Sequence, residues 1–334
     1  MKKPIRIGLI GYGFMGRAHS NAFAQVGHFF DSQHELVLQA VCARNEEGVR
    51  KFADRWGYKS IETDWRKLIA RDDIDLIDIA VPNNLHAEMA VAAAKAGKMV
   101  LCEKPLALAV EHGREMVEAC RNAGVIFRVA FQIRMEEILN RVREVLKAGT
   151  LGELRSVMFE RIAPLRQHGA WRDDPQQGGV LFDVAVHLFD QVEWLTGLKV
   201  GELSAYSHPD RREGKADSTI AILGTLGADC HVVVRASREI AVAGNDLRIQ
   251  GTRGMLTTSA LRWEKEHVLT IKTADGETVE RFPASPIYPR QIEAFAAEVR
   301  GAPGVLAPGE AGVRAIELAS AAIESIRTRR SVPV

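Results

Sequence analysis

A glycine-rich loop near the amino terminus limits what this chain can fold into more than any other feature. Gly11, Gly13 and Gly16 form a G-x-G-x-x-G pattern, directly after the apolar run IRIGLI and at the start of a helix-like segment. In that setting the first glycine permits a tight turn and the second lets the backbone approach a pyrophosphate. The third lets the helix pack against the strand. The loop therefore predicts a dinucleotide-binding turn, with Phe14 and Met15 beside the cofactor.

Short apolar runs alternate with helix-prone segments through the first part of the chain. The apolar runs are LVLQAVCA, DLIDIAVP, MVLCEKP and VIFRVAF, separated by segments such as NEEGVRKFADRWG and HAEMAVAAAKAG. Strands that are apolar throughout, each followed by a helix, are typical of a parallel sheet covered on both faces. Right-handed crossovers then give a doubly wound sheet. We therefore predict a Rossmann domain over residues 1–124.

The pattern changes after about residue 125. Five apolar segments follow one another with only short turns between them: STIAILGTL, CHVVVRAS, NDLRIQG, GMLTTS and HVLTIKT. Closely spaced strands with tight turns indicate an antiparallel sheet. Helix-like segments precede and follow this series. Residues 125–334 are therefore predicted to form a second domain of the α+β class.

Composition excludes several classes of function. The 334 residues are 46% hydrophobic, and 44 Lys and Arg nearly balance 43 Asp and Glu. This balance argues against nucleic acid or a membrane surface as the main partner. The four cysteines form no C-x-x-C pair and no metal-ligand spacing, which indicates reduced thiols and no metal. With no signal-like start and no run near the about 20 apolar residues of a membrane span, we expect a cytoplasmic protein.

The second strand bears on the choice of cofactor. Its end reads VCARN and lacks the Asp or Glu that would bind both ribose hydroxyls and repel a 2′-phosphate. Arg44 stands there instead, and a guanidinium suits phosphate oxygens. The sequence therefore favours NADP over NAD, although a solvated loop arginine is an alternative reading of Arg44.

Two further motifs carry chemistry. Glu103, Lys104 and Pro105 end the fourth apolar run, and the carboxyl ends of parallel strands face the ligand. Lys104 is therefore a candidate acid–base residue. Asp183 and His187 lie four residues apart on a predicted helix and so share one face. His187 suits the removal of a hydroxyl proton. Asp183 would bind a substrate hydroxyl or hold the imidazole in one tautomer.

Together these motifs resemble the glucose–fructose oxidoreductase/inositol dehydrogenase family (Gfo/Idh/MocA). The resemblance covers nearly the whole chain and is carried by GLIGYGFMGRAHSNAF, IDLIDIAVPNNLHAEMAVAAAKAGKMVLCEKPLA and GGVLFDVAVHLFD. It implies a Rossmann domain followed by a domain with a large open, mainly antiparallel sheet. It also implies hydride transfer between NAD(P) and a carbon of a sugar, anhydrosugar or cyclic polyol, and a homodimer or homotetramer formed through the open sheet.

The resemblance also implies roles for particular residues. The family's catalytic lysine falls on Lys104, its acid–base histidine on His187 and its substrate-binding aspartate on Asp183. The expected cofactor-lining residues, besides the glycine loop, are Pro82, Asn83, His86 and Glu103.

Five residues outside these motifs are further candidates for substrate binding. Gln132 and Arg134 lie in the run FQIR, where the family often has Asn-Tyr. Trp171 and Arg172 precede the helix of His187, and an aromatic face beside a guanidinium suits a sugar ring. Tyr288 precedes a late helix and would close the pocket.

Two other classes of function remain open at this stage. One is a glycoside hydrolase that uses NAD for transient oxidation of a ring carbon. That activity would need an additional acid–base pair, which the sequence does not reveal. The other is an NAD(P)-binding sensor without catalysis. The presence of Lys104, Asp183 and His187 together argues against it.

Overall fold

A computed structural model describes residues 3–30, 34–162, 170–176, 178–242, 244–259 and 265–334. The chain divides into two compact units. The first unit consists of residues 1–132 and 286–313, and the second unit of residues 133–285 and 314–334.

The first unit is built on a parallel sheet of doubly wound topology. Its strands follow the order β3-β2-β1-β4-β5-β6, and the short β15 adds antiparallel to β6. The order reverses between β1 and β4, and the carboxyl ends of strands at such a switch point form the ligand site of open α/β sheets. The bounds are β1 Lys3–Ile10, β2 His34–Cys42, β3 Ser60–Glu62, β4 Leu76–Ile79, β5 Met99–Cys102, β6 Phe127–Val129 and β15 Ala307–Pro308.

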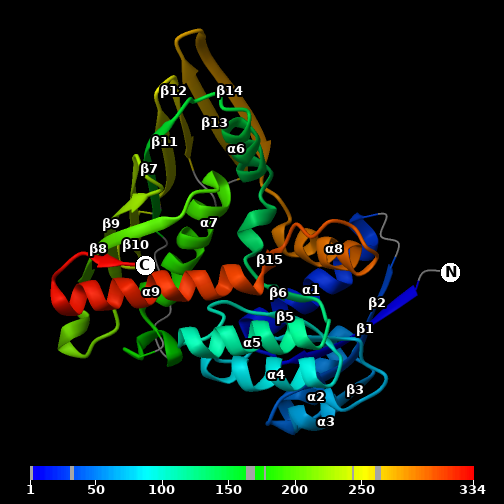
Figure 1. The fold of residues 1–334 in the computed structure, drawn as a ribbon. Helices are drawn as coiled ribbons and strands as arrows, with labels where there is room; N and C mark the ends of the chain where they lie inside the picture. Colours follow the sequence, from blue (N-terminus) through cyan, green and yellow to red (C-terminus); the bar gives the residue numbers. More distant parts are fainter. Residues whose placement is uncertain (1–2, 31–33, 163–169, 177, 243, 260–264) are drawn as a thin grey trace. The chain divides into compact units, whose positions relative to one another are not determined.

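Helices cover this sheet. Helix α1 packs against α2 and α8, while α4 packs against α3 and α5 (Figure 1). All four residues of β4 are buried, which explains why its sequence is a continuous apolar run interrupted only by Asp78. The bounds are α1 Phe14–Phe29, α2 Glu46–Trp56, α3 Trp65–Ile69, η1 Asn83–Leu85, α4 His86–Lys95, α5 Val110–Asn122 and α8 Ile287–Val299. The predicted fold class of this part of the chain is confirmed.

The second unit is built on a nine-stranded sheet with the order β14-β13-β12-β11-β7-β10-β9-β8-β16. Every neighbouring pair is antiparallel except β7 and β10, which are parallel. The prediction of a mainly antiparallel sheet is therefore confirmed. The bounds are β7 Leu154–Ile162, β8 Val200–His208, β9 Thr219–Leu226, β10 Cys230–Ser237, β11 Gly244–Gly251, β12 Gly254–Ser259, β13 Glu266–Thr273, β14 Gly276–Pro283 and β16 Val332–Pro333.

Helices pack on one face of this sheet. Helix α6 contacts β13, α7 contacts β7, and the two helices contact each other (Figure 1). Alternation along β7 buries Val157 and Phe159 on the helix side and leaves Met158 exposed on the other side. The bounds are η2 Gln132–Met135, α6 Glu137–Lys147, η3 Ala170–Asp173, η4 Leu181–Ala185, α7 Val186–Thr196, η5 Arg211–Glu213 and α9 Gly309–Thr328.

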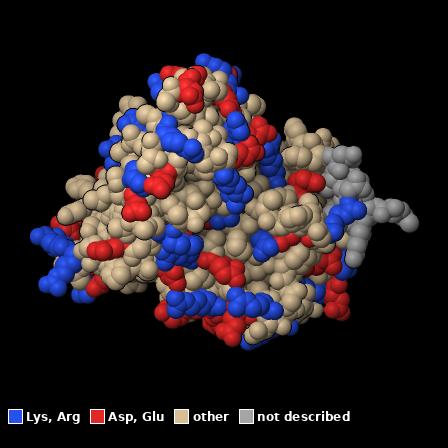
Figure 2. Space-filling view, turned by 45° about the horizontal axis from the view of Figure 1, so that its top comes forward, with Lys and Arg blue, Asp and Glu red and all other residues tan. Residues whose placement is uncertain are grey.

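Surface charge is mixed. Lys and Arg are interspersed with Asp and Glu over the face drawn in Figure 2, in keeping with the formal net charge of +1. No helix in the described ranges is long and apolar enough to cross a membrane. Within the same ranges, no group of three His, Cys, Asp or Glu side chains is arranged to hold a metal ion.

Candidate functional site

The glycine loop joins β1 to α1, and two of its glycines are required by close backbone contacts. Gly11 has a φ of +101°, and a Cβ atom there would lie 2.3 Å from the carbonyl oxygen of Ala80. A Cβ atom at Gly16 would lie 2.2 Å from the carbonyl oxygen of Gly11. Both positions therefore exclude any side chain, as a tight turn and close helix–strand packing require.

Gly13 differs from the other two glycines because the space beside it is open. Among the described atoms, none lies within 4 Å of where its Cβ would be. Gly13 is also the N-cap of α1, and no described side chain caps that end. The first amides of a helix need a partner and favour an anion. The loop therefore fits the pyrophosphate of a dinucleotide, with Phe14 exposed beside it.

The end of β2 presents Arg44 to solvent. Arg44 is exposed and follows the buried Cys42, while Asn45 caps α2 by accepting a hydrogen bond from the backbone of Gly48 at 2.9 Å. This local structure needs Asn45 and leaves the Arg44 side chain at the surface. Whether Arg44 selects NADP stays a prediction.

The loop after β4 holds Pro82, Asn83 and His86. Pro82 is exposed, whereas Asn83 and His86 are buried. The His86 ring lies between two loops, with Nε2 3.0 Å from the Val81 carbonyl and Nδ1 3.0 Å from the Pro105 carbonyl. Burial lowers the pKa of His86. His86 thus ties the loop after β4 to the loop after β5, and its predicted contact with cofactor stays a prediction.

Lys104 stands at the end of β5 on the same edge of the sheet as the glycine loop, because β1, β4 and β5 are parallel neighbours. It is half-buried, and the Lys104–Pro105 peptide is cis. Its backbone N–H donates to Glu103 Oε2 at 3.1 Å. Glu103 is only 4% exposed, so its carboxylate lies on the protein-interior side of the Lys104 backbone.

Behind Glu103 lie two residues that the sequence analysis did not single out. His19, on α1, is fully buried, with Nε2 2.9 Å from Glu103 Oε1 and Nδ1 2.9 Å from Asp78 Oδ2. Burial alone would lower the pKa of His19, but Asp78 and Glu103 together raise that pKa well above its usual range. The sequence contained one signal for this group: Asp78 is the single acidic residue in the otherwise apolar run LIDI, and a buried carboxylate needs a partner.

Gln132 and Tyr288 meet in the first unit although they lie far apart in the sequence. The Gln132 amide donates to the Tyr288 hydroxyl at 3.3 Å, and the Tyr288 ring centroid lies 6.3 Å from that of His19. Two of the predicted substrate-binding residues are thus neighbours and lie close to the group behind Lys104.

In the second unit, Asp183 lies in a π-helical segment and His187 in the α-helix that continues it. The segment η4 covers Leu181–Ala185, and α7 begins at Val186. The sequence analysis predicted one regular helix here. Single turns of π-helix are rare and concentrate at functional sites. His187 is 4% exposed and the Asp183 side chain 14% exposed.

Asp217 anchors the start of this helical segment. Its Oδ2 accepts the backbone N–H of Leu181 at 2.8 Å, and its Oδ1 is paired with the Arg211 guanidinium. A Cβ at Gly179 would lie 2.3 Å from Asp217 Oδ1, so the glycine makes room for this carboxylate. Asp217 is fully buried. Neither Asp217 nor Arg211 was predicted from the sequence, because both follow the helical segment by about 30 residues in a loop without a recognisable pattern.

Asp183 is also held from the preceding loop. Arg172 Nε donates to Asp183 Oδ2 at 3.1 Å. The buried Arg238 guanidinium donates to the Arg172 carbonyl at 3.2 Å and so fixes the η3 turn. Arg172 is therefore brought to Asp183, which lies four residues before His187 on the same helical run. The side chain of Trp171 lies outside the described part of the chain.

Arg134 takes part in a buried ion pair. Its Nε and Nη2 donate to the two oxygens of Asp190 at 2.8 and 2.5 Å, and its guanidinium lies 5.4 Å from the Trp194 ring centroid. This arrangement gives Arg134 a structural partner on α7. Its predicted contact with substrate stays a prediction.

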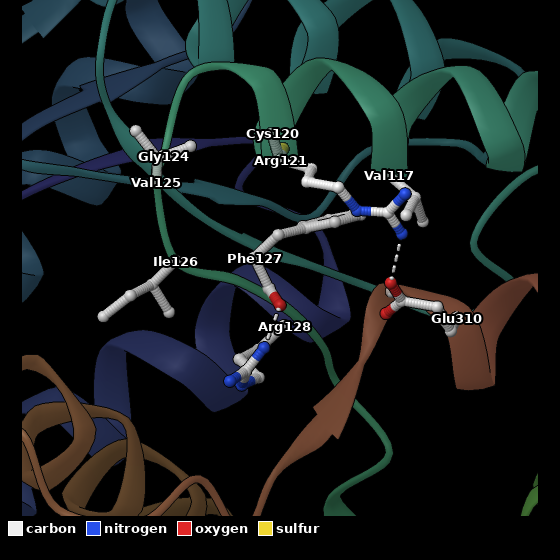
Figure 3. A pocket seen from close by; sticks show the side chains of 10 residues that line it. Val117, Cys120, Arg121, Gly124, Val125, Ile126, Phe127, Arg128 and Glu310 are labelled. Atoms are coloured by element: carbon white, nitrogen blue, oxygen red, sulfur yellow. Dashed lines mark hydrogen bonds and ion pairs between the residues drawn. The ribbon is translucent and has the colours of Figure 1, made fainter.

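A surface hollow lies at the opposite edge of the parallel sheet. It is lined by the end of α5, the turn before β6 and the start of α9, and Arg121 is paired with Glu310 across it (Figure 3). Because this hollow lies at the amino end of β6, it is separate from the edge that carries the glycine loop and Lys104.

Three relatives illustrate the similarity to known proteins. The levoglucosan dehydrogenase of Pseudarthrobacter phenanthrenivorans is 34% identical over 67% of this chain and 60% of its own length. The myo-inositol 2-dehydrogenase of Thermotoga maritima is 28% identical over 98% of both chains. A solved structure of a levoglucosan dehydrogenase in complex with NADH is 26% identical, covers 99% of both chains and superposes with a TM-score of 0.86.

Two family models match the chain. Residues 5–131 match the oxidoreductase family with the NAD-binding Rossmann fold, and residues 139–257 match the carboxyl-terminal domain of the same family. Known members are NAD(P)-dependent oxidoreductases of sugars and polyols. The glycine loop, the EKP strand end and the Asp183–His187 segment are thus set in the fold that these members share, and the chain belongs to the Gfo/Idh/MocA oxidoreductase family.

Proposed function

We propose that this protein transfers a hydride between NAD(P) and a secondary alcohol or ketone carbon of a sugar, an anhydrosugar or a cyclic polyol. One observation carries the proposal: the glycine loop and Lys104 stand at the carboxyl ends of neighbouring strands of one parallel sheet. That edge is where such sheets bind a dinucleotide. An ammonium group there lies on the side of the sheet at which a substrate oxygen would be reduced or oxidised.

Three residues have different roles in the proposed proton transfer. A bound nicotinamide supplies the hydride acceptor or donor. In the oxidative direction the His187 imidazole takes the hydroxyl proton, and the Lys104 ammonium donates a hydrogen bond to the oxygen as it gains charge. Asp183 binds a neighbouring hydroxyl or orients the imidazole. Because Lys104 and His187 belong to different units, the proposal requires both units to act on one substrate carbon.

The proposed substrate class is supported by residues that recognise hydroxyl groups. Arg172 and Asp183 form a polar pair at the start of the helical run that carries His187. In the first unit, Gln132 and Tyr288 form another. Side chains that combine donors and acceptors suit a polyhydroxylated ring. Levoglucosan and myo-inositol are the substrates in the names of two relatives, and both are cyclic compounds with several secondary hydroxyls.

For the cofactor, we propose a preference for NADP. The support is the exposed Arg44 at the end of β2 and the absence of a carboxylate in the run VCARN. A related levoglucosan dehydrogenase binds NADH, so both cofactors belong in the test.

We further propose that the protein is a homodimer or homotetramer joined through the open face of the second unit's sheet. Leu223, Val233 and Met158 lie side by side on β9, β10 and β7. Leu223 is 57% exposed and Met158 is 44% exposed. An apolar row of this kind on a sheet face is typical of an interface. Light scattering after gel filtration should show a smaller species for Leu223→Arg than for the parent.

The experiment that tests the function is a panel of sugars, polyols and ketoses with NAD and NADP, followed through the absorbance of the reduced nicotinamide. Lys104→Met and His187→Ala should lower turnover to a small residual rate and leave cofactor affinity, measured by fluorescence titration, within a few-fold of the parent. Parent-like activity in either variant would show that its assigned role is wrong. If the parent enzyme shows no activity with any member of the panel, the proposed substrate class is wrong.

A further inference from the structure

Three ionisable side chains form a buried row behind Lys104. The His19 ring lies between the carboxylates of Asp78 and Glu103, and each ring nitrogen is 2.9 Å from a carboxylate oxygen. His19 and Asp78 are fully buried and Glu103 is 4% exposed. The residues come from α1, β4 and the end of β5, so the row links a helix to two neighbouring strands.

The contacts of the His19 ring indicate how many protons this row holds. Nδ1 is hydrogen-bonded to Asp78, whereas Nε2 faces Glu103 Oε1 at 2.9 Å as an ion-pair contact outside hydrogen-bond geometry. Ionised carboxylates are only acceptors, so a carboxylate oxygen this close to a buried ring nitrogen is favourable when that nitrogen is protonated. With both ring nitrogens protonated, the row of three residues bears a net charge of −1. The row thus places one negative charge next to the backbone of Lys104.

Glu103 connects this row to Lys104. One carboxylate oxygen faces His19 Nε2, and the other accepts the backbone N–H of Lys104 at 3.1 Å. The imidazole therefore fixes the carboxylate that in turn fixes the backbone from which the lysine side chain extends. On the far side, Asp78 holds Nδ1 and sets the orientation of the ring.

Among the described residues, the other titratable groups near the row are neutral ones. His86, which interacts electrostatically with Glu103, has a pKa lowered by burial. The Tyr288 ring approaches from α8 with its centroid 6.3 Å from that of His19. The buried Tyr58 hydroxyl bonds to Ser20 on α1 at 2.9 Å, and the Cys102 thiol lies buried at the end of β5. Burial raises the pKa of both Tyr58 and Cys102, so both stay neutral.

We propose that His19 is a positioning residue for Lys104 that acts through Glu103. The proposal rests on the proposed hydride transfer. Three buried charged groups are costly to desolvate, and an apolar cluster of the same volume would often stabilise a protein as well or better. The row therefore suits a function, namely to hold the strand end and its lysine in one geometry.

Steady-state kinetics of His19→Gln test this role. The glutamine keeps a polar side chain, but its donors share one nitrogen and cannot replace two ring nitrogens that face different carboxylates. Glu103 and the Lys104 backbone should therefore lose their fixed position. We expect kcat to fall about 10²-fold, the size of effect that a misplacement of about 1 Å can cause. The KM for substrate and the Kd for cofactor should stay within threefold. His28→Gln, the same change at an exposed position of α1, should behave as the parent.

Nuclear magnetic resonance on 15N-histidine-labelled parent protein gives a second readout. At pH 8, an imidazole that donates from both nitrogens should show two protonated ring nitrogens with strongly downfield protons. Both signals should vanish in His19→Gln and persist in His28→Gln. A solvated histidine with an ordinary pKa of about 6.5 would be neutral at this pH.

The outcomes separate the proposal from its alternatives. A kcat within threefold of the parent in His19→Gln overturns it, and so does a loss confined to cofactor affinity. If His19→Gln does not fold, the parent spectrum decides, because a single protonated nitrogen at pH 8 contradicts the row as described. Lys104→Met is assayed in parallel. If Lys104→Met keeps full activity, the proposed function has failed in its own right, whatever His19 does.

Discussion

The two units hold their candidate catalytic residues in different ways. In the first unit, the sheet itself places Lys104, because neighbouring parallel strands end at the same edge. The backbone N–H of Lys104 also donates a hydrogen bond to the Glu103 carboxylate. In the second unit, Asp183 and His187 lie on a helical segment whose start is anchored by Asp217 from a loop about 30 residues away.

Sequence and topology are sufficient to place Lys104, but they are not sufficient to place Asp183 and His187. A parallel sheet gathers the ends of β1, β4 and β5 whatever lies between them, so local motifs reveal the site. A helix packed on an antiparallel sheet has no such edge, and side chains from distant segments must fix its start.

The largest expected effect is on the anchor of the second unit. Asp217→Asn removes the charge that pairs with Arg211, whose side chain is 8% exposed, and an uncompensated buried charge costs about 3 kcal/mol. The free energy of unfolding in urea should fall by that amount, and kcat should fall with it. Asp210→Asn breaks the exposed pair with Arg212 on the same turn and should change neither quantity measurably. Equal effects of the two changes would refute the anchor.

In the first unit, the glycine loop should separate folding from cofactor binding. Gly11→Ala places a Cβ against the Ala80 carbonyl at a φ of +101°, which should destabilise the fold by about 2 kcal/mol. Gly13→Ala enters open space, so stability should hold while the cofactor Kd rises about tenfold. Thermal unfolding and fluorescence titration measure the two effects. The loop account is wrong if the two variants show the same pattern.

The buried row of the first unit predicts a dependence of stability on pH. The pKa of His19 is raised in the folded protein by Asp78 and Glu103, so its ion pairs stabilise the fold fully below about pH 6.5, the ordinary value. As pH rises toward the raised pKa, that contribution should be lost by about 1.4 kcal/mol per unit. Unfolding at a series of pH values should show this slope in the parent and in His28→Gln. A parallel slope in His19→Gln would contradict it.

The smallest effect is expected at the end of β2. Arg44→Ala should weaken NADP by about fivefold, since an exposed ion pair contributes at most about 1 kcal/mol. NAD affinity should stay unchanged. Titration of both cofactors against the variant and the parent measures this, and an unaltered ratio of the two affinities would remove the argument for the 2′-phosphate.

The elements that could be predicted were those with a strong periodic or continuous apolar pattern, such as β1, β4 and α1. The strand β3 was missed because it has three half-buried residues, and β14 because its residues are largely exposed on both faces. The π-helical turn at Asp183 has no known sequence signature, so a regular helix was predicted.

The residues of the candidate site also differ in whether they could be predicted from the sequence. Lys104 and the glycines lie in local motifs, and Asp183 and His187 show helical spacing. His19, Asp78, Arg211 and Asp217 act through contacts between residues far apart in the sequence, which only the fold brings together. Arg134 was predicted to face substrate, and its buried partner Asp190, 56 residues away, could not have been chosen from the pattern.

The proposed function requires Lys104 of the first unit and His187 of the second unit to act on one carbon. A double-mutant cycle on kcat with Lys104→Met, His187→Ala and the combined variant measures whether they do. Groups that act as a unit give losses that do not add. We predict that the combined variant is within about threefold of the slower single variant. Losses that multiply, or a single variant that keeps the activity of the parent, would contradict the account.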